Sequence, residues 1–336
     1  MIFDSESVFE ENVITVLKQH GWKDGVLRYP TERDLLDNWK GILYRNNNDI
    51  DRLGKYPLTD GEMTQIIEQI ETLRTPLALN SFVNGRTVSI TRDNKEDVAH
   101  FGKEVSLYIY DRKEIAGGKS TYQIAQQPVY PAKNKMLNSR RGDLVLLING
   151  MPLIHIELKK SGIPVSQATN QIEKYAHEGV FTGLFRLVQI FVAMNPDDAV
   201  YFANPGVDKF NPSYYFHWAD YNNEPICGGQ NPGKDEWKLF IGGTSGTAGL
   251  LSIPMAHQLI GFYTIADSAD GCLKVLRSYQ YIAANAISDV VRKCDWEQRP
   301  ATPGRPGGYV WHTTGSGKTM TSFKSAQLIA DSHDAD

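Results

Sequence analysis

The chain has 336 residues, which is more than one domain of ordinary size and favours two. Its 41% hydrophobic and 22% charged residues are ordinary for a globular protein and exclude a mostly disordered chain. The net charge of −4 excludes a chain that is basic throughout, so any affinity for nucleic acid has to come from a local cluster of lysine and arginine.

The sequence carries no sign of a membrane segment or of disulfide chemistry. No apolar run reaches the ~20 residues of a membrane-spanning helix, and residues 1–11 lack the basic start and apolar stretch of a secretory signal. Cys227, Cys272 and Cys294 lie far apart and have no metal-ligand spacing. Such a sparse, odd set fits reduced thiols, so we expect a cytoplasmic protein with no membrane partner.

A helix is predicted near the N-terminus. Its apolar residues recur at helical spacing, and they are Phe9, Val13, Ile14 and Leu17. Gly21 is expected to end this helix. Short strands with turns are predicted between residues 83 and 110, including 88–90 and 105–110.

The second half of the chain alternates irregular stretches with regular elements. Residues 202–235 are rich in Asn, Pro, Gly and aromatics, which predicts irregular structure, and the glycine-rich stretch 242–249 is the expected linker. Residues 275–291 carry an apolar stripe and good helix formers. A Pro/Gly/Arg loop is expected at 299–308, followed by a short strand at 309–311.

A hairpin is predicted in the segment GDLVLLINGMPLIHIELKK, residues 142–160. The continuous apolar run 144–148 suits a strand that is buried on both faces, and 153–158 return as the second strand. Asn149-Gly150 favours a tight two-residue turn, because both positions tolerate positive φ.

This hairpin brings together side chains suited to phosphodiester hydrolysis. Side chains alternate along a strand, so Glu157 and Lys159 point to one face, and the hairpin brings Asp143 beside Glu157. Two carboxylates can hold Mg²⁺, which polarises a phosphate and lowers the pKa of a bound water. Lys159 would orient or deprotonate that water, or stabilise charge on the phosphate. The alternative is an edge hairpin with a surface ion pair between Glu157 and Lys159 or Lys160.

Two flanking features support the same interpretation. Gln167, Gln171 and Tyr175 share one face of a predicted helix and would contact DNA backbone or steady the carboxylates; a solvated helix face is the alternative. A basic cluster just before the hairpin consists of Lys133, Lys135, Arg140 and Arg141. This cluster is either a phosphate-binding patch or a solvated loop.

These residues resemble the PD-(D/E)xK nuclease core in its RecB-type form. The matching positions are Asp143, Glu157, Lys159, Gln171 and Tyr175. The local sequence RRGDLVLLING…IHIELKK is similar to that of the nuclease domain of type I restriction subunits in particular. The resemblance implies an α/β domain over 1–250 with a mixed sheet flanked by helices, Asp143 and Glu157 as metal ligands, and Glu10 completing the catalytic set. The proline that often precedes the first aspartate is replaced here by Gly142.

The segment WHTTGSGKTMT, residues 311–321, is typical of a phosphate-binding loop between a strand and a helix. The residues expected to bind nucleotide are Gly315, Ser316, Gly317, Lys318 and Thr319. Lys318 would reach the β- and γ-phosphates, and the Thr319 hydroxyl would help to hold Mg²⁺. The full pattern asks for glycine where this chain has His312. The alternative is a glycine-rich turn that binds nothing.

The loop HTTGSGKT resembles that of superfamily 2 motors within type I restriction subunits. Upstream, residues 277–280 read RSYQ and look like the segment with which those motors recognise adenine, with Gln280 as the base contact. The resemblance implies the beginning of a RecA-like ATPase lobe over 256–336, with ATP as the ligand of the intact protein. Type I restriction subunits are much longer, so we expect a fragment that does not hydrolyse ATP by itself.

The function implied by the resemblance is that of a restriction subunit, which cleaves double-stranded DNA with Mg²⁺ after ATP-driven translocation. Its partners would be methyltransferase and specificity subunits that read the target sequence, so its own DNA contacts would be mainly to phosphates. Two alternatives remain: a repair-type helicase-nuclease, and a DNA-binding or assembly module with an inactive nuclease core.

Overall fold

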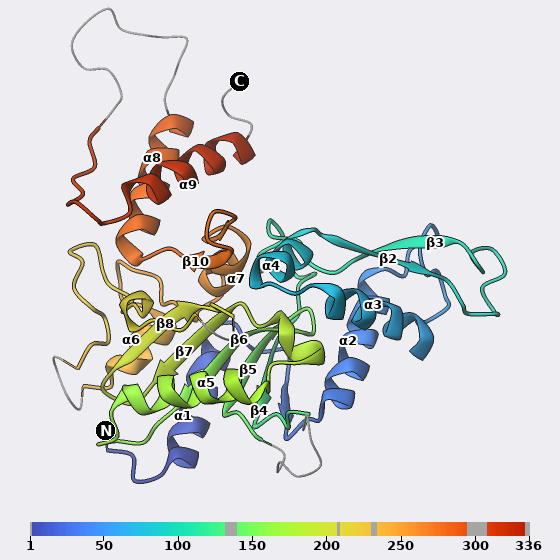
Figure 1. Cartoon of the computed structure of the whole chain (residues 1–336), viewed down its shortest axis with the longest axis horizontal. Helices are drawn as coiled ribbons and strands as arrows, with labels where there is room; N and C mark the ends of the chain where they lie inside the picture. The colour runs from blue at the N-terminus through green and yellow to red at the C-terminus, as the bar shows by residue number, and fades with distance from the viewer. Residues whose placement is uncertain (1, 132–139, 207–208, 230–233, 294–307, 333–336) are drawn as a thin grey trace, which may run out of the picture. The chain divides into compact units, whose positions relative to one another are not determined.

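The computed structural model describes residues 2–131, 140–206, 209–229, 234–293 and 308–332 (Figure 1). These residues form two compact units. The first comprises Met1–Trp218 and Ile226–Val275, and the second comprises Ala219–Pro225 and Leu276–Asp336. None of the helices in the described ranges is both long and apolar enough to cross a membrane.

The core of the first unit is a six-stranded mixed sheet with the order β1-β4-β5-β6-β7-β8. The strands are β1 (Val26–Arg28), β4 (Tyr122–Gln126), β5 (Leu144–Ile148), β6 (Met151–Leu158), β7 (Ile190–Met194) and β8 (Ala199–Ala203). β1 is parallel to β4 and β6 is parallel to β7, while the other neighbours are antiparallel. Every residue from β4 to β8 within a strand is buried, which explains why β5, β7 and β8 read as continuous apolar runs.

The predicted hairpin is confirmed by β5 and β6. Asn149 and Gly150 turn the chain with φ of 52° and 82°, as the dipeptide predicts. Leu144 pairs with Ile156 across the hairpin, so the residue before β5 lies beside Glu157. β6 pairs with β5 on one side and with β7 on the other, so it is a central strand of the sheet.

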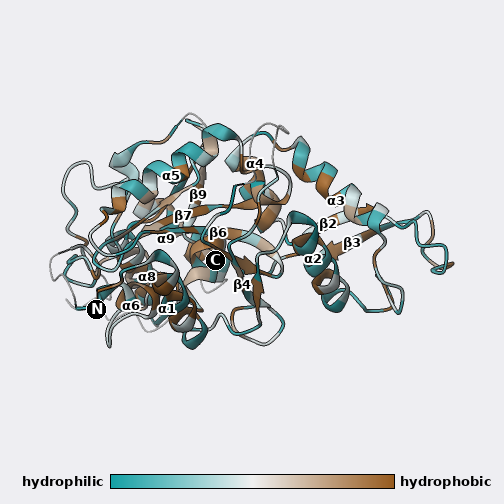
Figure 2. Ribbon diagram, turned by 90° about the horizontal axis from the view of Figure 1, so that it is seen from below, coloured by the Kyte–Doolittle hydropathy of each residue, from teal (hydrophilic) through white to brown (hydrophobic). Residues whose placement is uncertain are grey.

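Helices cover both faces of the sheet. Figures 1 and 2 show α5 (Val165–Glu178) on one face and α1 (Glu6–Gln19) with α6 (Glu236–Gly242) on the opposite face. The apolar stripe of α5 packs against β7 and β8 through Ala168, Ile172, Phe191, Ala193, Val200 and Phe202. These helices supply the second and third layers of an α/β fold, as predicted.

The N-terminal helix is held by residues from much later in the chain. Helix α1 is capped by the Ser5 side chain and is followed by Gly21 with φ of 108°, which confirms the predicted helix. The Phe9 ring packs edge-on against that of Trp237, with centroids 5.2 Å apart. Just after the helix, the Trp22 Nε1–H donates to the Leu251 carbonyl over 2.6 Å. The beginning and the end of the first unit are therefore packed together.

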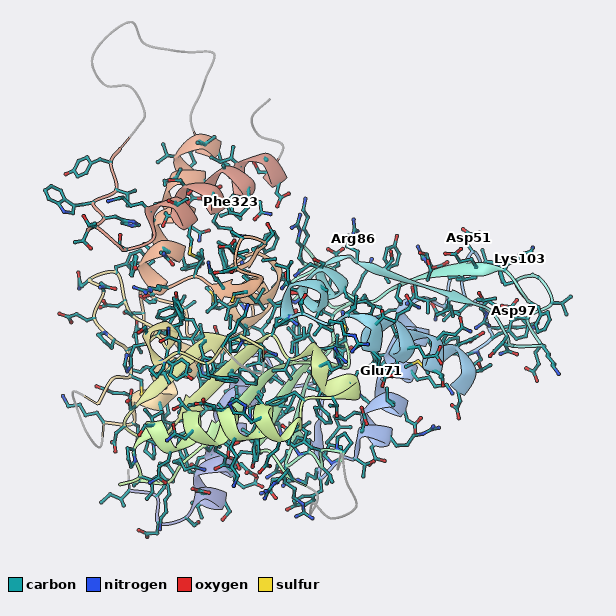
Figure 3. The ribbon with its side chains drawn as sticks, in the orientation of Figure 1. Asp51, Glu71, Arg86, Asp97, Lys103 and Phe323 are labelled. Carbon is teal, nitrogen blue, oxygen red and sulfur yellow. The ribbon has the colours of Figure 1, made fainter. Side chains whose placement is uncertain are left out.

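Residues between β1 and β4 build an extension of the first unit. Its elements are α2 (Glu32–Asn46), α3 (Asp60–Thr72), α4 (Pro76–Asn84), β2 (Thr87–Thr91) and β3 (Glu104–Tyr108). β2 and β3 pair antiparallel, which confirms the two predicted strands, although the second ends at Tyr108. Figure 3 shows Arg86 at one end of this hairpin and Lys103 with Asp97 at the other.

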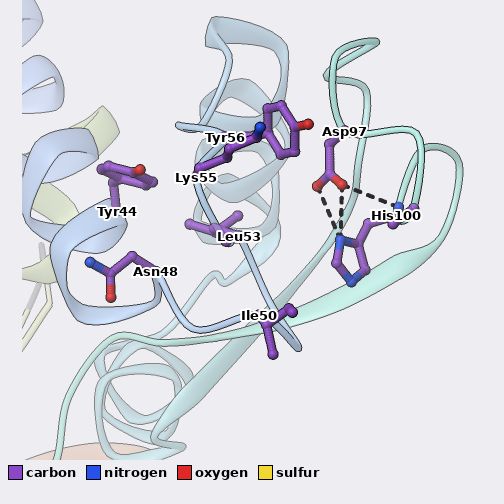
Figure 4. Close-up of a pocket in the computed structure, with 10 residues that line it drawn as sticks. Tyr44, Asn48, Ile50, Leu53, Lys55, Tyr56, Asp97 and His100 are labelled. Atoms are coloured by element: carbon purple, nitrogen blue, oxygen red, sulfur yellow. Dashed lines mark hydrogen bonds and ion pairs between the residues drawn. The ribbon is translucent and has the colours of Figure 1, made fainter.

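A cavity of about 610 Å³ opens in this extension (Figure 4). It is lined by Tyr44, Asn48, Ile50, Leu53, Gly54, Lys55, Tyr56, Asp97, Ala99 and His100. Asp97 accepts a hydrogen bond from the His100 backbone and contacts its Nδ1, and it also pairs with the buried Arg92. These lining residues include none of the predicted nuclease or nucleotide-binding residues.

The glycine-rich stretch expected to be a linker is instead packed inside the first unit. A Cβ on Gly249 would lie 2.3 Å from the Ile241 carbonyl oxygen, so glycine serves close packing here rather than flexibility. The Trp218 Nε1–H donates to the Ala248 carbonyl over 2.8 Å. The linker prediction is therefore wrong, whereas the division into domains 1–250 and 256–336 stays a prediction about functional modules.

Three further elements complete the first unit, namely α7 (Met255–Gly261), β9 (Thr264–Asp267) and β10 (Cys272–Val275), with two short 3₁₀ turns at Gly183–Leu187 and Pro212–Tyr214. On α7, the His257 ring is buried. Its Nε2–H donates to the Asp111 carbonyl over 3.0 Å, so its Nδ1 accepts from the Tyr122 hydroxyl over 2.9 Å. Burial lowers the pKa of His257 to about 4, against a smaller opposing effect of Asp111 and Glu114.

The second unit contains α8 (Ser278–Lys293) and α9 (Lys318–Ser332), which pack against each other. Helix α8 confirms the helix predicted at 275–291. Most of the loop predicted at 299–308 lies outside the described residues. The strand predicted at 309–311 is wrong, because these residues form no strand and Tyr309 and Trp311 are exposed. The described part of this unit offers no neighbouring strand with which they could pair.

We expect Gly150→Ala to lower the free energy of unfolding by about 2–4 kcal/mol, because the new Cβ combines a strained positive φ with an overlap against packed side chains. That Cβ would lie 2.9 Å from Cα and from Cδ1 of Trp39. Urea denaturation measures the change. The matched control is Gly41→Ala in α2, where a Cβ meets nothing within 4 Å. The control should raise stability by about 0.5–1 kcal/mol, and equal effects of the two substitutions would contradict the turn geometry.

We expect the buried His257 to make the protein acid-sensitive. Its folded pKa of about 4 lies below the usual value of 6.5, so the unfolded chain takes up the proton first. The stabilisation that the neutral, buried His257 ring gives the folded state is complete above pH 6.5 and is lost as the pH falls toward 4. From about pH 7.5 to about pH 5, the wild type should lose about 2 kcal/mol more than His257→Gln, measured by urea denaturation. Equal losses in both proteins would show that His257 is not buried as a neutral ring.

Candidate functional site

The centre of the candidate site is the carboxylate of Glu157, which is fully buried on β6. Within the described residues, neither of its oxygens has a hydrogen-bond partner. Lys159 Nζ lies 3.5 Å from Oε1, and His155 Nε2 lies 3.4 Å from Oε2. Because Glu157 is buried in a central strand, the alternative of an edge hairpin with a surface ion pair is wrong.

Asp143 lies directly before β5 and faces Glu157, as the hairpin predicts. Its Oδ2 accepts a hydrogen bond of 2.7 Å from the Leu158 backbone N–H, which fixes the carboxylate against β6. Burial, and then the neighbouring Glu157, raise the pKa of Asp143. Burial also raises the pKa of Glu157 to about 8, although Lys159 and Asp143 act in the opposite direction. Without a cation, this pair therefore retains a proton at neutral pH.

Lys159 supplies the positive charge of the cluster. Its side chain is largely buried, and its Nζ donates to the Leu158 carbonyl over 3.0 Å. The same Nζ lies 3.6 Å from Glu6 Oε1, on α1. The lysine is thus held between β6 and the first helix, next to Glu157.

Glu10 reaches the same region from α1. Its side chain is buried, and it accepts hydrogen bonds from Gln126 Nε2 over 2.6 Å and from Gln127 Nε2 over 3.3 Å. Burial raises the pKa of Glu10. The charge of Glu10 in turn raises the pKa of Asp143, so the two carboxylates interact electrostatically. In the described ranges, no group of three or more His, Cys, Asp or Glu side chains is close enough to hold an ion together.

Gln171 and Tyr175 act on the backbone that leads into Asp143. Gln171 Nε2 donates to the Tyr175 hydroxyl over 2.7 Å, and that hydroxyl donates to the Arg141 carbonyl over 2.9 Å. Tyr175 is buried on α5, while Gln167 is exposed. Of the two roles predicted for Tyr175, this geometry favours steadying the carboxylates over contact with DNA.

Two of the four residues of the basic cluster, Arg140 and Arg141, lie within the described residues. Arg140 pairs with Glu178 over 2.8 Å, and Arg141 is exposed with its guanidinium 5.9 Å from the centre of the Tyr29 ring. Lys133 and Lys135 lie outside the described residues.

Sequence reasoning missed several residues that surround the carboxylates. Gln126 and Gln127, at the end of β4, hold Glu10, and nothing in their surrounding sequence marks them. His155 contacts Glu157 from two residues earlier on β6. The signal for His155 was its place in IHIE, where one imidazole interrupts an apolar run on the face that carries Glu157.

The predicted nucleotide loop lies in the second unit and precedes α9. Gly315 and Gly317 adopt φ of 80° and 79°, which glycine tolerates best. The Ser316 backbone N–H and hydroxyl both donate to the Thr313 carbonyl. Lys318 and Thr319, at the start of α9, are exposed.

Gln280, predicted to contact adenine, lies buried on α8 and contacts this loop. Its Nε2–H₂ donates to the Ser316 carbonyl over 3.0 Å, and its Oε1 accepts from the Arg277 backbone N–H over 3.0 Å. The Tyr279 hydroxyl donates to the same Ser316 carbonyl over 2.8 Å. The upstream segment and the loop are therefore joined, while the roles of all these residues stay predictions.

Comparison with known proteins places this arrangement in a family. A family model described as "Type I restriction enzyme R protein N terminus" matches residues 4–210, and one described as "SWI2/SNF2 ATPase" matches residues 279–336. Endonuclease subunits of type I restriction enzymes from Staphylococcus saprophyticus and Staphylococcus aureus are 30% and 31% identical over 99% of this chain. One from Escherichia coli is 26% identical over 92% of the chain.

The chain spans 31% of the length of the two staphylococcal subunits and 90% of the Escherichia coli subunit. The R-protein family model covers more than half of the 336 residues, including the whole Asp143–Lys159 hairpin. On this ground, the chain belongs to the family of type I restriction enzyme R proteins.

Proposed function

We propose that this chain cleaves phosphodiester bonds of double-stranded DNA with the help of Mg²⁺. The catalytic core would be a PD-(D/E)xK nuclease domain over residues 1–250, with Asp143 and Glu157 as the metal ligands. The observation that carries the proposal is the buried Glu157 carboxylate, which lacks a hydrogen-bond partner among the described residues and lies beside Lys159. A buried carboxylate whose oxygens accept no hydrogen bond is costly unless it keeps a proton or a cation binds it.

The chemistry of the donor set fits Mg²⁺. Asp143 and Glu157 offer hard oxygen ligands, and a pair of carboxylates is enough because Mg²⁺ keeps several waters and takes further ligands from the substrate phosphate. The raised pKa values of both carboxyls agree with a site that is completed by positive charge. When bound, the ion would polarise the scissile phosphate and lower the pKa of a water.

The remaining residues would orient the reactants. Lys159 holds its ammonium group 3.5 Å from Glu157, where it can orient the attacking water or stabilise the charge that develops on the phosphate. The Tyr175 hydroxyl accepts from Gln171 and donates to the Arg141 carbonyl, which fixes the backbone before Asp143. Glu10, buried and held by Gln126 and Gln127, would complete the catalytic set.

In the intact protein, we propose that cleavage is coupled to ATP-driven DNA translocation. Residues 256–336 would begin a RecA-like lobe, in which Lys318 and Thr319 contact the phosphates and Mg²⁺ and Gln280 contacts adenine. Methyltransferase and specificity subunits of the same system would be the partners that read the target, in the cytoplasm. The match of residues 279–336 to an ATPase family supports this assignment.

The alternatives are a repair-type helicase-nuclease and an assembly module with an inactive nuclease core. The similarity to restriction subunits over 99% of the chain favours restriction over repair. The convergence of Asp143, Glu157 and Lys159 in one buried cluster disfavours an inactive core.

Lys159→Ala, in the full-length subunit assembled with its partners, should abolish DNA cleavage and leave ATP hydrolysis nearly intact. The lysine contacts the proposed nuclease carboxylate and no residue of the nucleotide loop among its described contacts. Both activities are measured on the same DNA with Mg²⁺. The matched control is Lys160→Ala, which removes an exposed lysine that points to Asp4. Cleavage by Lys159→Ala at the rate of the control would place the cutting site elsewhere.

Mg²⁺ should stabilise the wild-type chain and should not stabilise Glu157→Gln, because the amide removes a charged ligand. At about 100 times its dissociation constant, a ligand that binds only the folded state adds about 2.7 kcal/mol, which a thermal melt detects as a shift of several degrees. Glu32→Gln is the control, since burial also raises the pKa of that remote carboxyl. A shift that persists in Glu157→Gln would remove Glu157 from the metal site.

A further inference from the structure

A tyrosine–histidine pair lies behind Glu157, and the proposed function does not use it. Tyr130 and His155 are both buried, with the Tyr130 hydroxyl oxygen 2.8 Å from His155 Nδ1. The His155 ring is surrounded by the aromatic rings of Tyr175, Phe181 and Phe191, with centroids 5.5–6.4 Å away. The other ring nitrogen, Nε2, faces Glu157 Oε2 at 3.4 Å.

The hydrogen-bonding needs of Tyr130 fix the position of the imidazole proton. A buried phenol O–H has to donate to an acceptor, and His155 Nδ1 is the acceptor that the described residues provide. The hydroxyl therefore donates to Nδ1, and the ring proton is on Nε2. The imidazole thus presents an N–H to the Glu157 carboxyl group.

Gly142 provides the space for this pair. A Cβ at position 142 would lie 2.5 Å from the Tyr130 hydroxyl oxygen and 2.8 Å from His155 Cε1. Both distances are too short for any side chain, so the residue before Asp143 has to be glycine as long as the pair is in place. The Tyr130–His155 pair therefore explains why this chain has Gly142 where the nuclease pattern often has proline.

We propose that Tyr130 and His155 are positioning residues for the metal ligand Glu157. The Tyr130 hydroxyl selects the His155 tautomer that turns an N–H, rather than a lone pair, toward Glu157 Oε2. The N–H then lies 3.4 Å from Oε2 and stabilises negative charge on that oxygen from the protein side, while Oε1 lies next to Lys159. The inference rests on the proposed function, and it makes His155 a neighbour of the ligand rather than a ligand itself.

The tautomer can be read directly in the metal-free protein by ¹⁵N NMR of labelled histidine. His155→Gln identifies the His155 signals by their loss. We expect a protonated Nε2 and an unprotonated Nδ1 near neutral pH in the wild type, with protonation of Nδ1 gaining population in Tyr130→Phe. A wild-type ring protonated on Nδ1, or on both nitrogens, would overturn the inference.

Mg²⁺ affinity, measured by isothermal titration calorimetry, tests the consequence for the site. Tyr130→Phe should weaken binding about tenfold and His155→Leu by about 10–100-fold, as is usual when a group that orients a metal ligand is lost. His155→Gln should recover part of the affinity, because its amide can donate to the carboxylate. A residue that served packing alone would not be rescued by a polar donor.

The matched control is Tyr122→Phe, which removes the same hydroxyl–imidazole contact at His257, away from the carboxylates. It should lower stability without changing Mg²⁺ affinity. If the wild type binds Mg²⁺ and Tyr130→Phe binds it equally well, the positioning role is overturned and the metal site stands. If the wild type binds no Mg²⁺, the proposed function fails together with the role of the pair.

Discussion

The burial of one carboxylate, Glu157, inside a sheet that is covered on both faces is the constraint on which the rest of the site depends. An apolar strand in that position would cost nothing, whereas a buried charge has to be compensated locally. The neighbouring groups provide this compensation only in part. Lys159 stays 3.5 Å away, and Asp143 adds a second acid rather than a base. The fold therefore keeps two adjacent acids in its core with raised pKa values, which is a property of sites that bind cations.

Other parts of the first unit are arranged around this constraint. Helix α1 contributes Glu6 and Glu10 from one face of the sheet, and α5 contributes Tyr175 from the opposite face. The Tyr175 contact is made to backbone, so it sets where the chain runs before Asp143 and adds no charge beside the carboxylates. Specific charges come from one layer and rigidity from another, and a change on either face alters the same pair of carboxylates.

The sequence was sufficient where local rules operate. The β5–β6 hairpin follows from an apolar run and Asn149-Gly150, and the meeting of Asp143 with Glu157 follows from strand alternation. It was insufficient where packing at a distance decides. The glycines at 242–249 read as a linker because flexibility and close packing require the same residue. The strand predicted at 309–311 failed because a strand needs a neighbour. The contact of Tyr130 with His155 spans 25 positions, beyond any local pattern.

The packing of α1 against the far end of the unit has a consequence for the order of assembly during synthesis. Phe9 is covered by Trp237, and Trp22 donates its indole N–H to Leu251. A nascent chain that has not yet exposed these later residues carries an N-terminal helix with its apolar side unprotected. Until Trp237 and Leu251 have emerged, Glu10 on that helix cannot be buried against the sheet. The cluster of carboxylates around Glu157 would thus stay incomplete on the ribosome until about three quarters of this chain has emerged.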